Sequence, residues 1–170
     1  EPQDTSRTMG SLIPKGVHWI KSAVAAFEPQ KNAIILDGCR VIKYKRMVVC
    51  PGLKLDWNKV EGLVDTLGQN GVTSNYRYDL APYTWELVQN MKEGRAIFTQ
   101  PPMPIKCAGA PQKAMYLSGD AWIRRGVLKD IDIQFNNAGG VLFGVKDYVP
   151  ALMKYVKKYD ASLNFFYNLA

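Results

Sequence analysis

The chain has 170 residues, which is enough for one domain with a sizeable core or for two smaller ones. A hydrophobic fraction of 47% and a charged fraction of 22% exclude a disordered or fibrous protein and indicate a globular one. The formal net charge of +7 favours an anionic partner, but the basic residues are dispersed and form no nucleic-acid-binding motif, so we predict no nucleic-acid partner.

The first part of the chain predicts a small antiparallel section. Residues 1–10 are polar, so we expect a loop there and no signal peptide. Residues 16–27 predict a short helix that runs into a strand. The apolar residues of 32–38 end in Asp-Gly, which predicts a strand followed by a hairpin turn. Residues 40–52 alternate and then become continuously apolar at 47–50, which predicts an antiparallel strand and then a strand buried on both faces.

The second part of the chain predicts alternating helices and strands. After loop-rich residues 53–80, we expect a helix from Pro82 with Gly94 as its C-cap, and Asp147 as the N-cap of a later helix. From residue 95 onward the order of elements predicts a parallel βαβαβ unit. The expected elements are a buried strand at 95–100, a helix at 113–125, a strand at 130–137, a helix at 148–159 and a strand at 162–168.

One of the three cysteines stands in an unusual place. Cys107 follows the stretch PPMPIK and precedes a helical pattern, beyond the carboxyl end of a predicted strand. Helix N-terminal amides and the nearby Lys106 and Lys113 favour thiolate over thiol. The pattern therefore allows a reactive thiol, but also a small buried cysteine that lines a turn. Cys39 and Cys50 are expected to be structural, with Cys50 in the core at the end of an apolar strand.

Motifs that the sequence lacks narrow the chemistry. There is no CxxC pair and His18 is the single histidine, so we predict no metal site. A dinucleotide-binding unit would carry GxGxxG between its first strand and helix, where this chain has PPMPIKCAGAPQK instead. The βαβαβ unit is therefore expected to keep a Rossmann-like shape without binding NAD.

Residues 98–118, FTQPPMPIKCAGAPQKAMYLS, closely resemble the signature of the sulfide:quinone oxidoreductases, which belong to the flavoprotein disulfide reductase superfamily. The resemblance continues through LIPKGVHWIKSAVAAFEPQKN, KRMVVCPGLKLDWNKVEGL, SNYRYDLAPYTWELVQNMKEGRAIFT and GGVLFGVKDYVPALMKYV. It implies an α/β fold: part of an FAD-binding domain with a small antiparallel section and a connecting helix at 1–94, then the start of a Rossmann-like pyridine-nucleotide-type domain at 95–170. The family's N-terminal βαβ motif and downstream cysteine segment are missing, so we expect a central fragment that is inactive alone.

The resemblance also implies a function for the complete protein. Cys107 matches one of two redox-active cysteines that flank FAD, and Val24, Pro51 and Gly52 match positions that contact FAD. Sulfide would attack the bridge between the cysteines and form a persulfide, and two electrons would pass through FAD to a quinone. The sulfur would then go to a small acceptor. A peripheral location at the mitochondrial inner membrane or the bacterial cytoplasmic membrane is implied as well.

Two alternatives stay open. A related type II NADH dehydrogenase would need the glycine fingerprint after AIFTQ, where it is missing. A non-catalytic Rossmann-like module that binds an anionic partner would tolerate alkylation of Cys107.

Overall fold

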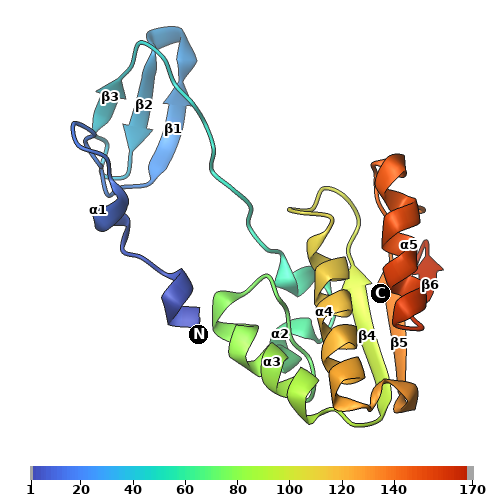
Figure 1. Cartoon of the computed structure of the whole chain (residues 1–170). Coiled ribbons are helices and arrows are strands. Elements are labelled where there is room, and N and C mark those ends of the chain that lie inside the picture. The colour runs from blue at the N-terminus through green and yellow to red at the C-terminus, as the bar shows by residue number, and fades with distance from the viewer. Residues whose placement is uncertain (1, 168–170) are drawn as a thin grey trace. The chain divides into compact units, whose positions relative to one another are not determined.

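The computed structural model describes residues 2–167, and the chain divides into two compact units, Glu1–Lys54 and Leu55–Ala170. Figure 1 shows the first unit as a small sheet with short helical turns, and the second as a sheet accompanied by longer helices. Each unit has its own sheet, and the two sheets differ in kind: the first is antiparallel and the second is parallel.

The first unit contains the predicted antiparallel section. Its sheet has the order β1 (Val24–Glu28), β2 (Ala33–Leu36) and β3 (Val41–Lys43). The expected hairpin turn is confirmed, because the amide of Leu36 donates to the carbonyl oxygen of Arg40 at 2.9 Å. Gly38 and Cys39 turn the chain there with φ values of +79° and +64°. The remaining elements are η1 (Pro2–Thr5), α1 (Met9–Leu12) and η2 (Pro29–Lys31).

Two expectations for the first unit are wrong. The residues before β1 form turns and bends, not a helix, and the nearest helix is α1. Residues 47–50 form no strand, and Val48 is 87% exposed. An apolar run becomes a buried strand only where neighbouring strands accept its backbone hydrogen bonds. The described residues supply no strand that pairs with this run, so it has no regular secondary structure and is exposed.

The second unit contains the predicted βαβαβ order. Strands β4 (Gly94–Gln100), β5 (Ile131–Asn137) and β6 (Ser162–Phe165) pair in parallel in that order, and α4 (Ala110–Arg125) and α5 (Val149–Lys158) connect them. The predicted helix at Pro82 is α3 (Ala81–Asn90). The shorter elements are η3 (Trp57–Lys59), α2 (Leu63–Thr66), η4 (Tyr78–Leu80), η5 (Leu128–Asp130) and η6 (Lys146–Tyr148).

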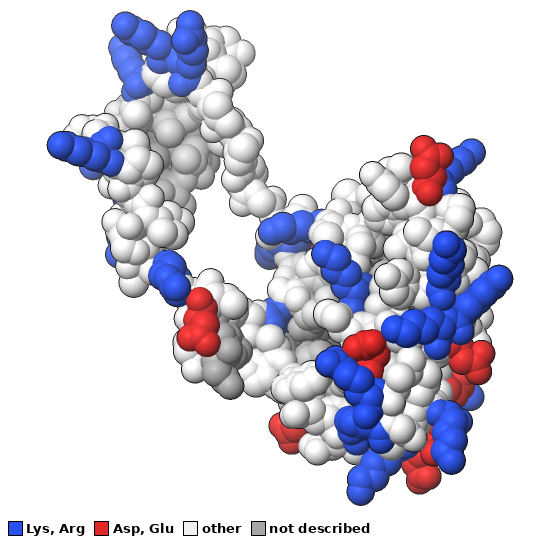
Figure 2. All heavy atoms as spheres, viewed as in Figure 1, with Lys and Arg blue, Asp and Glu red and all other residues white. Residues whose placement is uncertain are grey.

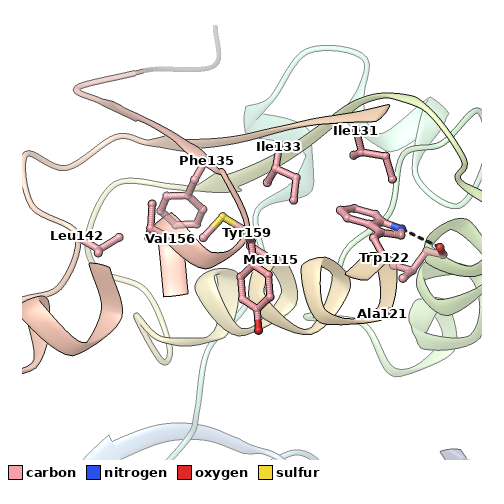
Figure 3. Packing of buried hydrophobic residues seen from close by; sticks show 10 residues of the cluster. Met115, Ala121, Trp122, Ile131, Ile133, Phe135, Leu142, Val156 and Tyr159 are labelled. Atoms are coloured by element: carbon pink, nitrogen blue, oxygen red, sulfur yellow. Dashed lines mark hydrogen bonds between the residues drawn. The ribbon is translucent and has the colours of Figure 1, made fainter. Parts of the chain in front are cut away.

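The core of the second unit lies between its sheet and the helices α4 and α5. Figure 3 shows Ile133 and Phe135 of β5 directed toward Met115 of α4, and all three side chains are 0% exposed. Val156 of α5 joins the same cluster. Residues that share a face in the parallel register, such as Ala96 with Ile133, point to this core, which explains why every second residue of β5 from Ile131 to Phe135 is apolar.

Three local expectations for the second unit are wrong. Strand β4, expected to be buried, has no fully buried residue, and Ile97 is 55% exposed on the face opposite the core. Gly94 begins β4 and does not cap α3, whose C-cap is Met91. Asp147 does not cap α5, because the turn η6 precedes the helix and places Tyr148 at the N-cap position.

Candidate active site

Cys107 lies in the loop that joins the carboxyl end of β4 to the N-terminus of α4. In parallel α/β sheets, ligands bind at this edge. The side chain of Cys107 is exposed, and its thiol forms no disulfide. The alternative of a buried cysteine that lines a turn is therefore wrong. Cys107 also has a φ of +61°, which is a left-handed backbone conformation that costs free energy in any residue except glycine.

Residues 75 and 76 hold the Cys107 loop from a distant part of the chain. The hydroxyl of Tyr76 donates to the carbonyl oxygen of Lys106 at 2.6 Å and lies 3.3 Å from that of Cys107. The side-chain amide of Asn75 donates to the carbonyl oxygen of Ala110 at 3.2 Å. Within the loop, the amide of Ala110 donates to the carbonyl oxygen of Cys107 at 2.9 Å. The backbone around the thiol is thus fixed on both sides while the sulfur stays open.

Tyr76 keeps its proton throughout the physiological range. Burial raises the pKa of Tyr76 above its ordinary value of 10.0, and negative charge on Cys107 raises it further. The backbone of Tyr76 is fixed as well, because its amide donates to the hydroxyl of Ser74 at 3.2 Å. A protonated phenol is the form that donates to carbonyl oxygens, so the interaction with the Cys107 loop is maintained.

Amide side chains form hydrogen bonds within the loop that follows β5, at the same edge of the sheet. Asn137, at the end of β5, is 0% exposed; it accepts a hydrogen bond from the amide of Gly139 and donates one to the carbonyl oxygen of Val141. Gln112 of α4 donates to the carbonyl oxygen of Leu142. These contacts shape the loop after β5, while the exposed thiol of Cys107 lies in the loop that follows β4 at the same edge.

Val24 lies in the first unit, at the start of β1. It pairs with Leu36, and 42% of its side chain is exposed. Strand β1 is at the edge of its sheet, so its outer backbone groups have no strand partner among the described residues. A cavity of about 400 Å³ lies beside this end of the strand, with Leu36, Trp19, Lys21 and Arg40 in its lining. Asp37 also lines this cavity, so the position offers open backbone beside two cationic side chains and one carboxylate.

Pro51 and Gly52 follow the exposed apolar run and are themselves exposed. Gly52 has a φ of +80°, and a Cβ atom added there would meet no heavy atom within 4 Å. The expectation that Cys50 lies in the core is wrong, because Cys50 is exposed like the residues before it. Since Cys107 belongs to the second unit, no single site that contains all four predicted residues is defined.

Sequence patterns did not indicate Tyr76, Asn75, Gln112 or Asn137 as residues of this edge. The tyrosine and its two carbonyl partners are separated by 30 and 31 positions, and only the folded chain brings them together. One signal was available: the stretch SNY is part of the resemblance that spans the chain. Among residues 2–167 no helix has the length and apolar character needed to cross a bilayer, and no cluster of three potential metal ligands occurs there.

Two curated proteins that are similar in sequence to this chain share one name. The chain is 40% identical over 168 residues to the mitochondrial sulfide:quinone oxidoreductase of Dictyostelium discoideum, a match that covers 98% of this chain and 37% of that protein. It is 40% identical to the mouse (Mus musculus) protein of the same name over 96% of this chain and 36% of that protein. No protein-family model matches the chain.

Solved structures share the fold at low identity. A chain of the Tetrahymena thermophila mitochondrial ATP synthase structure superposes with a TM-score of 0.68 at 16% identity, covering 97% of this chain and 43% of that one. The sulfide:quinone oxidoreductase of Aquifex aeolicus superposes with a TM-score of 0.64 at 16% identity, covering 86% of this chain and 34% of that one.

The antiparallel sheet, the parallel βαβαβ unit and the solved structures that superpose on them define an α/β protein with an FAD-binding type of fold. The relatives at 40% identity make the assignment narrower: the chain belongs to the sulfide:quinone oxidoreductase family. It spans about a third of the length of the curated relatives that it matches.

Proposed function

We propose that this chain is a section of a sulfide:quinone oxidoreductase and that Cys107 is one of its redox-active cysteines. The observation that supports this most is the open thiol at the carboxyl edge of a parallel sheet, on a backbone fixed from both sides. A cysteine whose disulfide is attacked by sulfide must be reachable and correctly oriented, and a buried structural cysteine would be neither.

The proposed reaction needs a second cysteine from outside this chain, joined to Cys107 by a disulfide. Hydrosulfide attacks one sulfur of that bridge, the S–S bond breaks, and the products are a persulfide on one cysteine and a thiolate on the other. Transfer of the outer sulfur to a small acceptor leaves two thiols. Their return to the disulfide releases two electrons and two protons. FAD, when bound, supplies the two-electron acceptor for this reoxidation and passes the electrons to a quinone.

Val24, Pro51 and Gly52 are the residues that we propose to lie against FAD. The open edge of β1 beside Val24 leaves backbone groups free to meet a planar ring, and the bare backbone at Gly52 lets a ligand approach closely. Lys21 and Arg40 in the adjacent cavity lining outnumber the single carboxylate of Asp37 there, which suits an anionic dinucleotide. We also propose that residues 1–94 are the C-terminal half of the FAD domain together with its connecting helix, and that residues 95–170 begin the Rossmann-like domain. This boundary differs from the division into compact units, which falls between Lys54 and Leu55.

We further propose a peripheral location at a mitochondrial membrane. The curated relatives that the chain matches are mitochondrial proteins by name, and a net charge of +7 suits contact with an anionic bilayer surface. Figure 2 shows Lys and Arg side chains on both units of the chain. The proposed partners are sulfide, a quinone and a small sulfur acceptor.

The decisive experiment compares Cys107→Ser with the unaltered whole protein. We expect the variant to bind FAD normally and to lose sulfide-dependent quinone reduction, because its hydroxyl cannot form the disulfide. Cys39→Ser, which changes another exposed cysteine, is the matched control and should keep full turnover. Turnover by the Cys107→Ser variant would refute the proposal. The 170-residue chain by itself is expected neither to saturate with FAD nor to turn over, and a yellow, flavin-saturated preparation would contradict that expectation.

A further inference from the structure

The contacts around Cys107 come from one short segment of the second unit. The Tyr76 hydroxyl shares its one proton between the carbonyl oxygens of residues 106 and 107, and the Asn75 side-chain amide donates to the carbonyl oxygen of residue 110. All three acceptors are carbonyl oxygens, so the bonds hold the path of the loop and leave the Cys107 sulfur unoccupied. The loop is thus held by tertiary contacts in addition to the local turn from Ala110 to Cys107.

The loop needs such support because of its backbone conformation. A φ of +61° at Cys107 is unfavourable for a residue with a Cβ atom, and it persists only where surrounding contacts determine it. The Tyr76 hydroxyl contacts the carbonyl oxygen of the peptide group before Cys107, which is that of Lys106, and the carbonyl oxygen of Cys107 itself. Loss of that hydroxyl would let the peptide planes rotate, and the direction of the Cα–Cβ bond of Cys107 would change with them.

We propose that Tyr76 is a positioning residue for the Cys107 thiol, with Asn75 in a supporting role. This inference rests on the proposed function, because it assigns the tyrosine to the site of sulfide attack. The hydroxyl does not touch the reacting atoms and acts through the backbone of Lys106 and Cys107. It fixes the line along which a nucleophile reaches the Cys107 disulfide and along which the leaving thiolate departs.

Tyr76→Phe in the whole protein tests the proposal, since it removes one oxygen and keeps the ring. The matched control is Tyr83→Phe, because the Tyr83 hydroxyl also binds the backbone, at the amide of Gly71 2.9 Å away, outside the Cys107 loop. Relative to this control, we expect Tyr76→Phe to lower kcat for sulfide-dependent quinone reduction by about tenfold to a hundredfold. Bound FAD and the thermal midpoint should match those of the control.

A second readout follows the loop without depending on turnover. The Ala110 amide, which donates to the Cys107 carbonyl, should exchange its hydrogen about fivefold to tenfold faster in Tyr76→Phe than in Tyr83→Phe, as expected for a lost hydrogen bond. Asn75→Ala, at an exposed position, should change kcat and exchange in the same direction by a smaller factor.

The outcomes separate this proposal from the one it rests on. If Tyr76→Phe matches Tyr83→Phe in kcat and exchange while Cys107→Ser is inactive, the positioning role is wrong and the proposed function stands. If Cys107→Ser keeps its turnover, both proposals are wrong. A lower kcat with faster exchange in Tyr76→Phe, and normal FAD content, supports the positioning role.

Discussion

Gly119 of α4 lies directly against the ring of Tyr159, at the end of α5. A Cβ atom placed at position 119 would stand 2.7 Å from Cγ of Tyr159 and 3.0 Å from its Cβ. Tyr159 is 3% exposed and belongs to the core cluster of the second unit. The absence of a side chain at 119 is therefore what allows α4 and the C-terminal end of α5 to pack this closely.

We expect Gly119→Ala to lower the free energy of unfolding by about 1–3 kcal/mol, as overpacking of a core does. The better helix propensity of alanine, about 1 kcal/mol, offsets part of the strain. Denaturant unfolding of the protein measures the difference. Gly144→Ala is the control, because a Cβ atom there would meet no heavy atom within 4 Å, and its effect should stay within about 0.5 kcal/mol. Equal effects of the two substitutions would contradict the packing argument.

Helices α3 and α4 are joined through one carbonyl oxygen. Val88 lies in the last turn of α3, where carbonyl groups lack partners within the helix. The indole Nε1 of Trp122 donates to its oxygen at 2.9 Å, as Figure 3 shows with a dashed line, and Nη1 of Arg125 donates to it at 2.8 Å. If one donor is removed, the other still forms a hydrogen bond with the Val88 carbonyl oxygen.

This sharing predicts a non-additive double-mutant cycle. Trp122→Phe and Arg125→Ala each leave Val88 with one donor, whereas the double variant leaves a buried carbonyl unpaired. We expect the double variant to lose about 1–3 kcal/mol more than the sum of the singles. Arg124→Ala is the control partner, since Arg124 pairs with Asp120 on the surface, and its effect should add to that of Trp122→Phe. An additive result for Arg125 would show that the carbonyl finds another partner.

Tyr116 predicts a loss of stability in alkaline solution. Burial raises the pKa of Tyr116 from 10.0 to about 12, and its hydroxyl donates to Oε1 of Gln112 at 3.0 Å. The unfolded chain releases this proton at lower pH than the folded chain. The stability from Tyr116 is thus fully present below pH 10.0 and is lost as the pH rises to about 12. Unfolding measured across this window should show a steeper decline for the unaltered protein than for Tyr116→Phe, and parallel curves would contradict the assignment.

The regular part of the fold could be predicted from the sequence because its signals are local. Alternation at 130–137 and the apolar spacing in the helix at 113–125 depend on neighbours a few positions away, and β5 and α4 confirm both. The order of these elements then fixed the parallel sheet. The position of Cys107 at the carboxyl edge of β4 followed from the same order.

Most of what the sequence did not predict depends on contacts between residues that are distant in sequence. The contact of Tyr76 with Lys106 joins residues 30 positions apart, and no local pattern encodes it. The run at 47–50 has the composition of a buried strand, but burial requires a neighbouring sheet, which composition cannot reveal. The N-cap of α5 differs from the prediction for a local reason. The 3-10 turn η6 includes Asp147 and leads directly into the helix, so that Tyr148 occupies the N-cap position.

The exposed run at 47–50 gives the last prediction. Val48 is 87% exposed, so in the 170-residue chain Val48→Asp should change the free energy of unfolding by no more than about 0.5 kcal/mol. Ile133→Asp is the opposite case: Ile133 is 0% exposed, and a carboxylate there would prevent stable folding of the second unit. An alkylating reagent should also label Cys50 without denaturant, because its side chain is exposed. Strong destabilisation by Val48→Asp together with a protected Cys50 would show that the run is buried after all, as its composition suggests.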